Sequence, residues 1–178
     1  MELGGSRVVR FIEPCAGGGD LIDHLEHFGM VCQSAYDIDP QRNDIEKADS
    51  LTKYFECSDV DYIITNPPWD REIFMPMMEK FMQFRPTWVL IDADLSHTIQ
   101  NKVSKKIGCM NVPELLKHCK KIVAVGRVKW IKNTKNQGKE NAVWMLFDKN
   151  HTTYPIFYPK LNNNKKESEN GRTTSKRE

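Results

Sequence analysis

The chain has 178 residues, which is enough for one domain with a hydrophobic core and short for two. Its composition is that of a globular protein, with 39% hydrophobic residues, and no apolar run is long enough to cross a membrane. The first residues lack the basic-then-apolar order of a secretory signal peptide, so we expect an intracellular, cytoplasmic protein without a membrane segment.

The charged residues are unevenly distributed along the chain. Residues 1–94 hold 8 Lys and Arg against 18 Asp and Glu, whereas residues 102–139 hold 11 Lys and Arg against the single acid Glu114. A basic second half is typical of a protein with a polyanionic partner such as nucleic acid. Lysines that only solvate helix faces would give the same pattern, and charge alone does not separate the two interpretations.

The cysteines are odd in number, scattered, and without a Cys-x-x-Cys pair: Cys15, Cys32, Cys57, Cys109 and Cys119. This favours free thiols in a reducing compartment. Two of them lie near His118, but the spacing fits no zinc pattern, so we expect no metal site.

The chain opens with a strand, a glycine turn and a helix. Residues 8–12 are apolar and β-branched, which predicts a strand, and residues 21–28 have apolar side chains at helical spacing, closed by Gly29. Between them lies the triplet Gly17, Gly18 and Gly19, where a ligand can approach the backbone closely. This order is typical of a βαβ unit that binds a nucleoside at the loop.

Two aspartates follow at positions that suit the same nucleoside. Residues 31–36 predict a second strand, and Asp37 ends it about twenty residues past the glycine turn, where a carboxylate meets ribose hydroxyls. Asp49 lies in the polar, irregular stretch 43–60 and could accept the exocyclic amine of an adenine ring. Each residue could instead be an ordinary solvated loop aspartate.

The most distinctive stretch is Asn66-Pro67-Pro68-Trp69, directly after an apolar strand at residues 61–65. Two prolines stop the strand and stiffen the chain, because neither has an N–H to donate. The Asn66 side-chain oxygen and the Pro67 carbonyl could accept two N–H bonds from an amine, while Trp69 stacks on its ring. The alternative is a proline-rich turn with Trp69 in the core.

The remaining stretches predict a mixed α/β domain. Residues 73–84 predict a core-facing helix, with Pro76 near its start or splitting it, and residues 88–91 predict a strand whose Asp92-Ala93-Asp94 end we interpret as a loop. Residues 95–121 predict a loop and a helix, and residues 121–131 and 141–147 an antiparallel hairpin. We expect one domain over residues 1–159 and a disordered basic tail over 160–178.

Taken in order, Glu13-Pro14-x-x-Gly17-x-Gly19, Asp37 and Asn66-Pro67-Pro68-Trp69 resemble the motifs of class I S-adenosylmethionine-dependent amino-methyltransferases, most of all the adenine-N6 enzymes. The resemblance spans about residues 7–148. It implies an α/β, Rossmann-like fold with a mostly parallel central sheet, an antiparallel C-terminal hairpin and helices on both faces.

The resemblance also implies site residues. S-adenosylmethionine would be the cofactor, with Glu13, Pro14, Cys15, Ala16 and the loop Gly17, Gly18 and Gly19 at its methionine end, Asp37 and Ile38 at its ribose, and Asp49 at its adenine. The catalytic residues would be Asn66, Pro67, Pro68 and Trp69. Near the target pocket, Arg127 and Trp130 would be substrate-binding candidates.

The acceptor class is left open by these motifs. We expect a nucleic acid, with DNA favoured and RNA possible, whereas protein glutamine N5, RNA guanine N2 and a non-catalytic subunit are the alternatives. The chain has no room for a separate target-recognition domain, so only segment 95–121, loop 132–140 and the tail could contact nucleic acid, or a partner subunit could do so.

Overall fold

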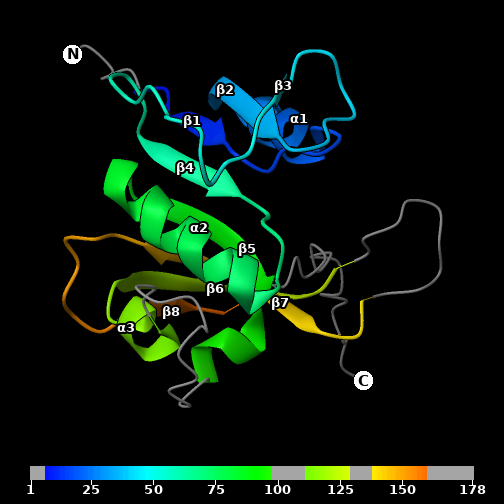
Figure 1. Ribbon diagram of the computed structural model, residues 1–178. Coiled ribbons are helices and arrows are strands. Elements are labelled where there is room, and N and C mark those ends of the chain that lie inside the picture. The colour runs from blue at the N-terminus through cyan, green and yellow to red at the C-terminus, as the bar shows by residue number, and fades with distance from the viewer. Residues whose placement is uncertain (1–6, 98–110, 129–137, 160–178) are drawn as a thin grey trace, which may run out of the picture.

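The computed structural model describes residues 7–97, 111–128 and 138–159. These residues form one eight-stranded sheet in the order β3-β2-β1-β4-β5-β7-β6-β8 (Figure 1). The strands are β1 Arg10–Glu13, β2 Val31–Asp37, β3 Glu46–Lys47, β4 Tyr62–Thr65, β5 Thr87–Asp92, β6 Cys119–Arg127, β7 Asn141–Phe147 and β8 Ile156–Tyr158. The helices are α1 Asp20–His27, α2 Arg71–Phe84, α3 Val112–Leu116 and the 3-10 helix η1 Ala93–His97.

The sheet is mixed, which confirms the predicted architecture. Strands β3, β2, β1, β4 and β5 pair in parallel, and β7 runs antiparallel between β5 and β6. From β1 the chain first builds outward through β2 and β3, then returns to the other side of β1 with β4. This reversal makes the crevice outside the carboxyl ends of β1 and β4 the place where an open α/β sheet binds ligands.

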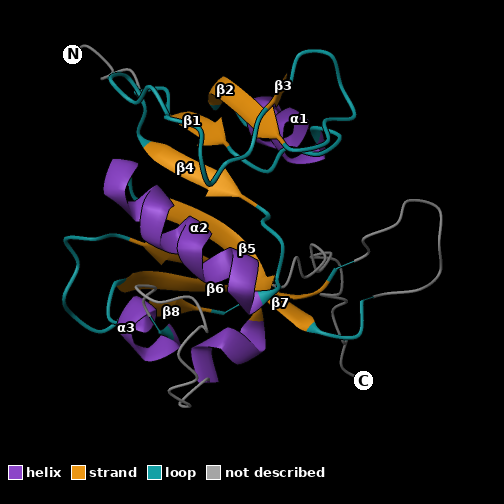
Figure 2. Cartoon of the chain, viewed as in Figure 1, coloured by secondary structure: helices purple, strands orange, loops and turns teal. Residues whose placement is uncertain are grey.

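Helices cover both faces of the sheet, also as predicted (Figure 2). On one face α1 packs through Ile22 against Phe11 of β1 and Ile64 of β4. On the other face α2 packs on β4 and β5, and α3 joins the same core. Side chains of successive residues in one strand therefore pack into hydrophobic cores on opposite faces of the sheet, because side chains alternate across a sheet.

Helix α2 runs unbroken through Pro76, so the proline neither lies at the first turn nor splits the segment. The Asp70 side chain caps its start by accepting the N–H of Glu72 at 2.8 Å. Its buried face, which includes Phe74, Met78 and Phe81, is 0% exposed at these positions. This packing stabilises the helix despite the backbone bond that a proline removes.

Two short strands were not predicted. β3 has two residues and pairs with the end of β2, and β8 pairs in parallel with β6. Across the described ranges, no helix has the length and apolarity needed to span a membrane. Trp130, the predicted tail and most of loop 132–140 lie outside the described residues, as does segment 98–110.

Candidate functional site

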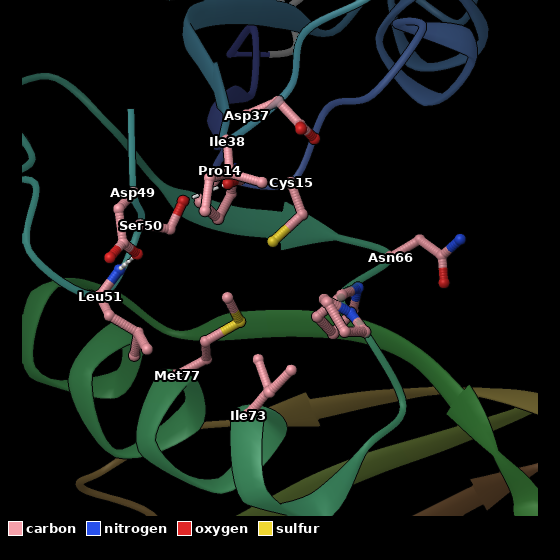
Figure 3. A pocket seen from close by; sticks show the side chains of 12 residues that line it. Pro14, Cys15, Asp37, Ile38, Asp49, Ser50, Leu51, Asn66, Ile73 and Met77 are labelled. Atoms are coloured by element: carbon pink, nitrogen blue, oxygen red, sulfur yellow. Dashed lines mark hydrogen bonds between the residues drawn. The ribbon is translucent and has the colours of Figure 1, made fainter. Parts of the chain in front are cut away.

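A cavity of about 520 Å³ lies at the carboxyl ends of β1, β2 and β4, beside α2 (Figure 3). Eight of the residues predicted for the site line it, namely Pro14, Cys15, Asp37, Ile38, Asp49, Asn66, Pro67 and Pro68. These come from four separate stretches of the chain, and the topology brings them to one edge of the sheet. In Figure 3, Asn66 lies at the opposite end of the cavity from Asp49 and Leu51.

The glycine loop is fixed to the end of β2. The N–H of Gly17 donates to Asp37 Oδ2 at 2.7 Å, and the carbonyl of Gly17 accepts the N–H of Gln41 at 3.0 Å. Gly17 and Gly19 have φ values of 51° and 79°, which favour glycine, and Gly19 caps the start of α1. The loop adjoins the cavity, although Ala16 and the three glycines do not line it.

Asp37 is half-buried and keeps capacity for a ligand. Its second oxygen, Oδ1, accepts the N–H of Asp39 at 2.8 Å. Each carboxylate oxygen has two lone pairs, so each retains one acceptor site. The residue can therefore hold the glycine loop in place and still accept from a pair of hydroxyls.

The loop that carries Asp49 is held from two sides. Ser50 is buried and its hydroxyl donates to the carbonyl of Pro14, which fixes the loop to the end of β1. From α2, the Lys80 ammonium donates to the carbonyl of Ser50 at 2.8 Å and to that of Lys53. Burial lowers the pKa of Lys80. These hydrogen bonds therefore hold in place the cavity wall that Asp49, Ser50 and Leu51 form.

At the end of β4, Asn66 offers an unused acceptor. Its Oδ1 atom is buried and has no hydrogen-bond partner within the described part of the chain. Trp69 is half-buried, donates its indole N–H to the carbonyl of Leu90 at 3.1 Å and packs against the core under α2. It does not line the cavity.

Glu13 lies behind the cavity wall. Its side chain is 1% exposed, and Oε1 accepts the N–H of Cys15 at 3.1 Å. Burial raises the pKa of Glu13 to about 8. The thiol of Cys15 also has its pKa raised to about 12 by burial, so it stays protonated and unreactive at neutral pH.

Four lining residues were not predicted as site residues: Ser50, Leu51, Ile73 and Met77. Ile73 and Met77 lie four residues apart on α2, so they share one helix face. The sequence predicts a core-facing helix here, because this spacing is also that of core residues. Of the predicted substrate-binding residues, Arg127 is exposed at the end of β6, away from the cavity lining.

The charge of the cavity suits a cationic ligand. Asp37 and Asp49 line it, and no Lys or Arg is among its lining residues. Apolar walls come from Ile38, Ile73 and Met77. Within the described ranges, no group of three or more His, Cys, Asp and Glu side chains is arranged to hold a metal ion.

Comparison with known proteins supports the fold alone. No protein-family model and no curated protein matches the chain. The 23S rRNA methyltransferase ErmE aligns at 13% identity and a TM-score of 0.51, over 82% of this chain and 63% of that one. A dimethyladenosine transferase from Plasmodium falciparum aligns at 15% identity and a TM-score of 0.48, over 78% of this chain and 55% of that one.

The M protein of the type I restriction enzyme EcoKI aligns at 14% identity and a TM-score of 0.44, over 86% of this chain and 44% of that one. The chain thus spans between 44% and 63% of the length of these proteins. The likeness to ErmE and the strand order together show that the chain has a Rossmann-like α/β fold.

Proposed function

We propose that the protein is an S-adenosylmethionine-dependent methyltransferase that transfers a methyl group to the exocyclic N6 amine of adenine in nucleic acid, DNA ahead of RNA. One observation carries the proposal. A single cavity joins Asp37, Asp49 and the Asn66-Pro67 turn, and the glycine loop is hydrogen-bonded to its rim. A nucleoside cofactor and an amine acceptor each find their polar partners there.

The residues of the cavity fit this cofactor. Asp37 would accept from the ribose hydroxyls, and Asp49 from the exocyclic amine of the cofactor's adenine, with Ile38, Ile73 and Met77 against the apolar parts. The cavity is lined by carboxylates and no basic side chain, which suits a ligand with a sulfonium and an ammonium group. When bound, the cofactor would supply an electrophilic methyl group.

Asn66 and Pro67 would orient the acceptor. The lone pair of an adenine N6 amine is delocalised into the ring, which makes it a poor nucleophile. Two acceptors that bind its hydrogens favour a pyramidal nitrogen and direct its lone pair toward the methyl group. Asn66 is neutral, so it polarises the amine without taking a full proton, which would pass to water after transfer.

Trp69 would complete the target pocket as a rigid stacking surface. Its bond to the Leu90 carbonyl holds the indole in one orientation, which lowers the entropy lost when a ring stacks on it. In a duplex the target base must leave the helix, and stacking would offset part of an unstacking cost of a few kcal/mol. Arg127 and Trp130 remain candidates for contacts to the substrate.

The nucleic-acid preference rests on charge. The 11 basic residues of segment 102–139 would contact phosphates in a sequence-independent, salt-sensitive manner. We expect a short or relaxed recognition site, or a partner subunit that supplies recognition. Within the cell we expect the protein in the cytoplasm.

The function is tested by product analysis. The purified protein is incubated with methyl-labelled cofactor and, in parallel, with duplex DNA, single-stranded DNA and RNA, followed by digestion to nucleosides and mass spectrometry. We expect labelled N6-methyladenine, mainly in DNA, and none with Asn66→Ala. Labelled N2-methylguanine in RNA would show that guanine is the acceptor, and labelled N5-methylglutamine in a parallel incubation with protein would show that protein is the acceptor. Cofactor binding with turnover only after a partner is added would indicate a subunit of a larger enzyme.

A further inference from the structure

Glu13 is a buried carboxylic acid, and none of the described basic side chains forms an ion pair with it. It is the last residue of β1 and lies between β2, where Ala35 is opposite it, and β4. Its Oε2 atom is buried and has no hydrogen-bond partner among the described residues, and the same holds for the hydroxyl of Thr65. An ionised carboxylate in such a site is strongly disfavoured unless something compensates its charge.

The groups that face Glu13 from the neighbouring elements supply no positive charge. On β4 the nearby hydroxyl of Thr65 lowers the pKa of Glu13, and on β2 the carboxylate of Asp37 raises it. Burial raises the pKa of the thiols of Cys15 and Cys32 to about 12, so both are neutral. In these surroundings Glu13 is neutralised by a proton of its own and not by a neighbouring cation.

The Glu13 carboxyl is hydrogen-bonded to the backbone of a cavity-lining residue, since its Oε1 accepts the N–H of Cys15. Pro14 and Cys15, the next two residues, line the cavity, and Thr65 is followed directly by the lining residue Asn66. A positive charge in the cavity would act on Glu13 through the protein, where charges are screened less than in water. Glu13 is therefore placed to respond to a cation that it does not have to touch.

We propose that Glu13 is a proton-linked binding group, which holds a proton while the cavity is empty and releases it to solvent when a cationic ligand enters. The ligand's positive charge then replaces the proton as the partner of the carboxylate. The identity of that ligand rests on the proposed function, since S-adenosylmethionine carries a sulfonium and an ammonium group.

The expected size of the effect follows from the free and bound states. With a pKa of about 8, Glu13 is about nine-tenths protonated at pH 7 in the free protein. A unit charge at roughly 7 Å, at an effective dielectric constant of about 20, would lower that pKa to near 6. Binding at pH 7 should then release roughly 0.8 proton, and affinity should rise about 20-fold from pH 6 to pH 8.

Isothermal titration calorimetry in buffers of different ionisation enthalpy counts these protons. The full chain is titrated at pH 7, where the ligand's own ammonium group is mostly protonated, with S-adenosylmethionine, with S-adenosylhomocysteine, which keeps the ammonium but lacks the sulfonium charge, and with neutral 5′-methylthioadenosine. We expect roughly 0.8 proton released by S-adenosylmethionine, fewer by S-adenosylhomocysteine and almost none by the neutral nucleoside. Glu13→Gln should abolish the release, and Glu56→Gln, at an exposed site, should preserve it.

The possible failures are distinguishable. Tight binding of S-adenosylmethionine with no proton release that depends on Glu13 would overturn the inference and leave the proposed function standing. Absence of binding by all three nucleosides would overturn the proposed function first. If Glu13→Gln does not fold, the wild-type protein still decides, because equal proton counts for S-adenosylmethionine and 5′-methylthioadenosine refute a response to charge.

Discussion

The buried carboxyl of Glu13 should make the stability of the fold fall as the pH rises, independently of any ligand. The pKa of Glu13 rises from 4.5 to about 8 in the folded protein because burial disfavours the charged form. Between these values the unfolded chain has lost a proton that the folded chain keeps. Raising the pH through this window therefore favours unfolding, and the penalty is complete above pH 8.

The magnitude follows from the same two values. One pKa unit corresponds to ~1.4 kcal/mol, so the whole window corresponds to on the order of 5 kcal/mol. Between pH 5.5 and pH 8 the contribution of Glu13 should cost roughly 3 kcal/mol of unfolding free energy. Glu13→Gln removes the titration while it keeps the shape of the side chain and its acceptor for the Cys15 N–H.

Urea denaturation followed by tryptophan fluorescence at the two pH values measures the difference. Other titrating groups cancel when the variant is compared with the wild type at each pH. We expect the unfolding free energy of Glu13→Gln, relative to wild type, to rise by roughly 3 kcal/mol between pH 5.5 and pH 8. A constant cost or gain at both pH values would show that Glu13 is already ionised in the fold, and the reasoning would be refuted. Glu56→Gln, at an exposed position, should show no such dependence.

Three other outcomes can be measured. Asn66→Ala should lower methyl transfer by at least about 10²-fold with the cofactor Kd nearly unchanged, as checked by turnover assays and calorimetry; equal losses in both would mean that its role is misassigned. Lys80→Met releases the loop it binds and should weaken cofactor affinity about tenfold with little change in turnover at saturation, whereas Lys149→Met, which removes an exposed contact to α2, should not. Leu115→Ala empties a fully buried position on α3 and should lower the unfolding free energy by about 2–5 kcal/mol in urea; a neutral result would place α3 outside the core.

The strand–turn–helix opening and the prolines after β4 could be predicted from sequence because each signal is local. Apolar β-branched runs, a glycine triplet and consecutive prolines restrict the backbone whatever the rest of the chain does. Parallel strands end at one edge of the sheet, so motifs that follow successive strands meet there. Asp37, Asp49 and Asn66, which end or follow β2, β3 and β4, accordingly line one cavity.

Other features depend on distant partners and left no local signal. β8 is a three-residue strand whose side chains are exposed, and only its pairing with β6 makes it a strand. Ile73 and Met77 have the helical spacing of core residues. They line the cavity because the loop that carries Asp49 and the turn after β4 leave a space beside this face of α2. The burial of Glu13 likewise depends on the strands on either side, which its own sequence neighbourhood does not reveal.

The unpaired polar atoms of the structure are concentrated at the proposed site. Folded proteins pair nearly all buried polar groups, and each exception costs about 1–3 kcal/mol. In the described part of the chain, five buried side-chain atoms have no partner, and three of them belong to Glu13, Thr65 and Asn66, at the carboxyl ends of β1 and β4. Of these three residues, Asn66 lines the cavity, and Glu13 and Thr65 are each directly followed by a lining residue. The polar groups without a partner in the empty protein are therefore concentrated where the proposed ligands would bind, and a cation or an amine bound there would offset part of their cost.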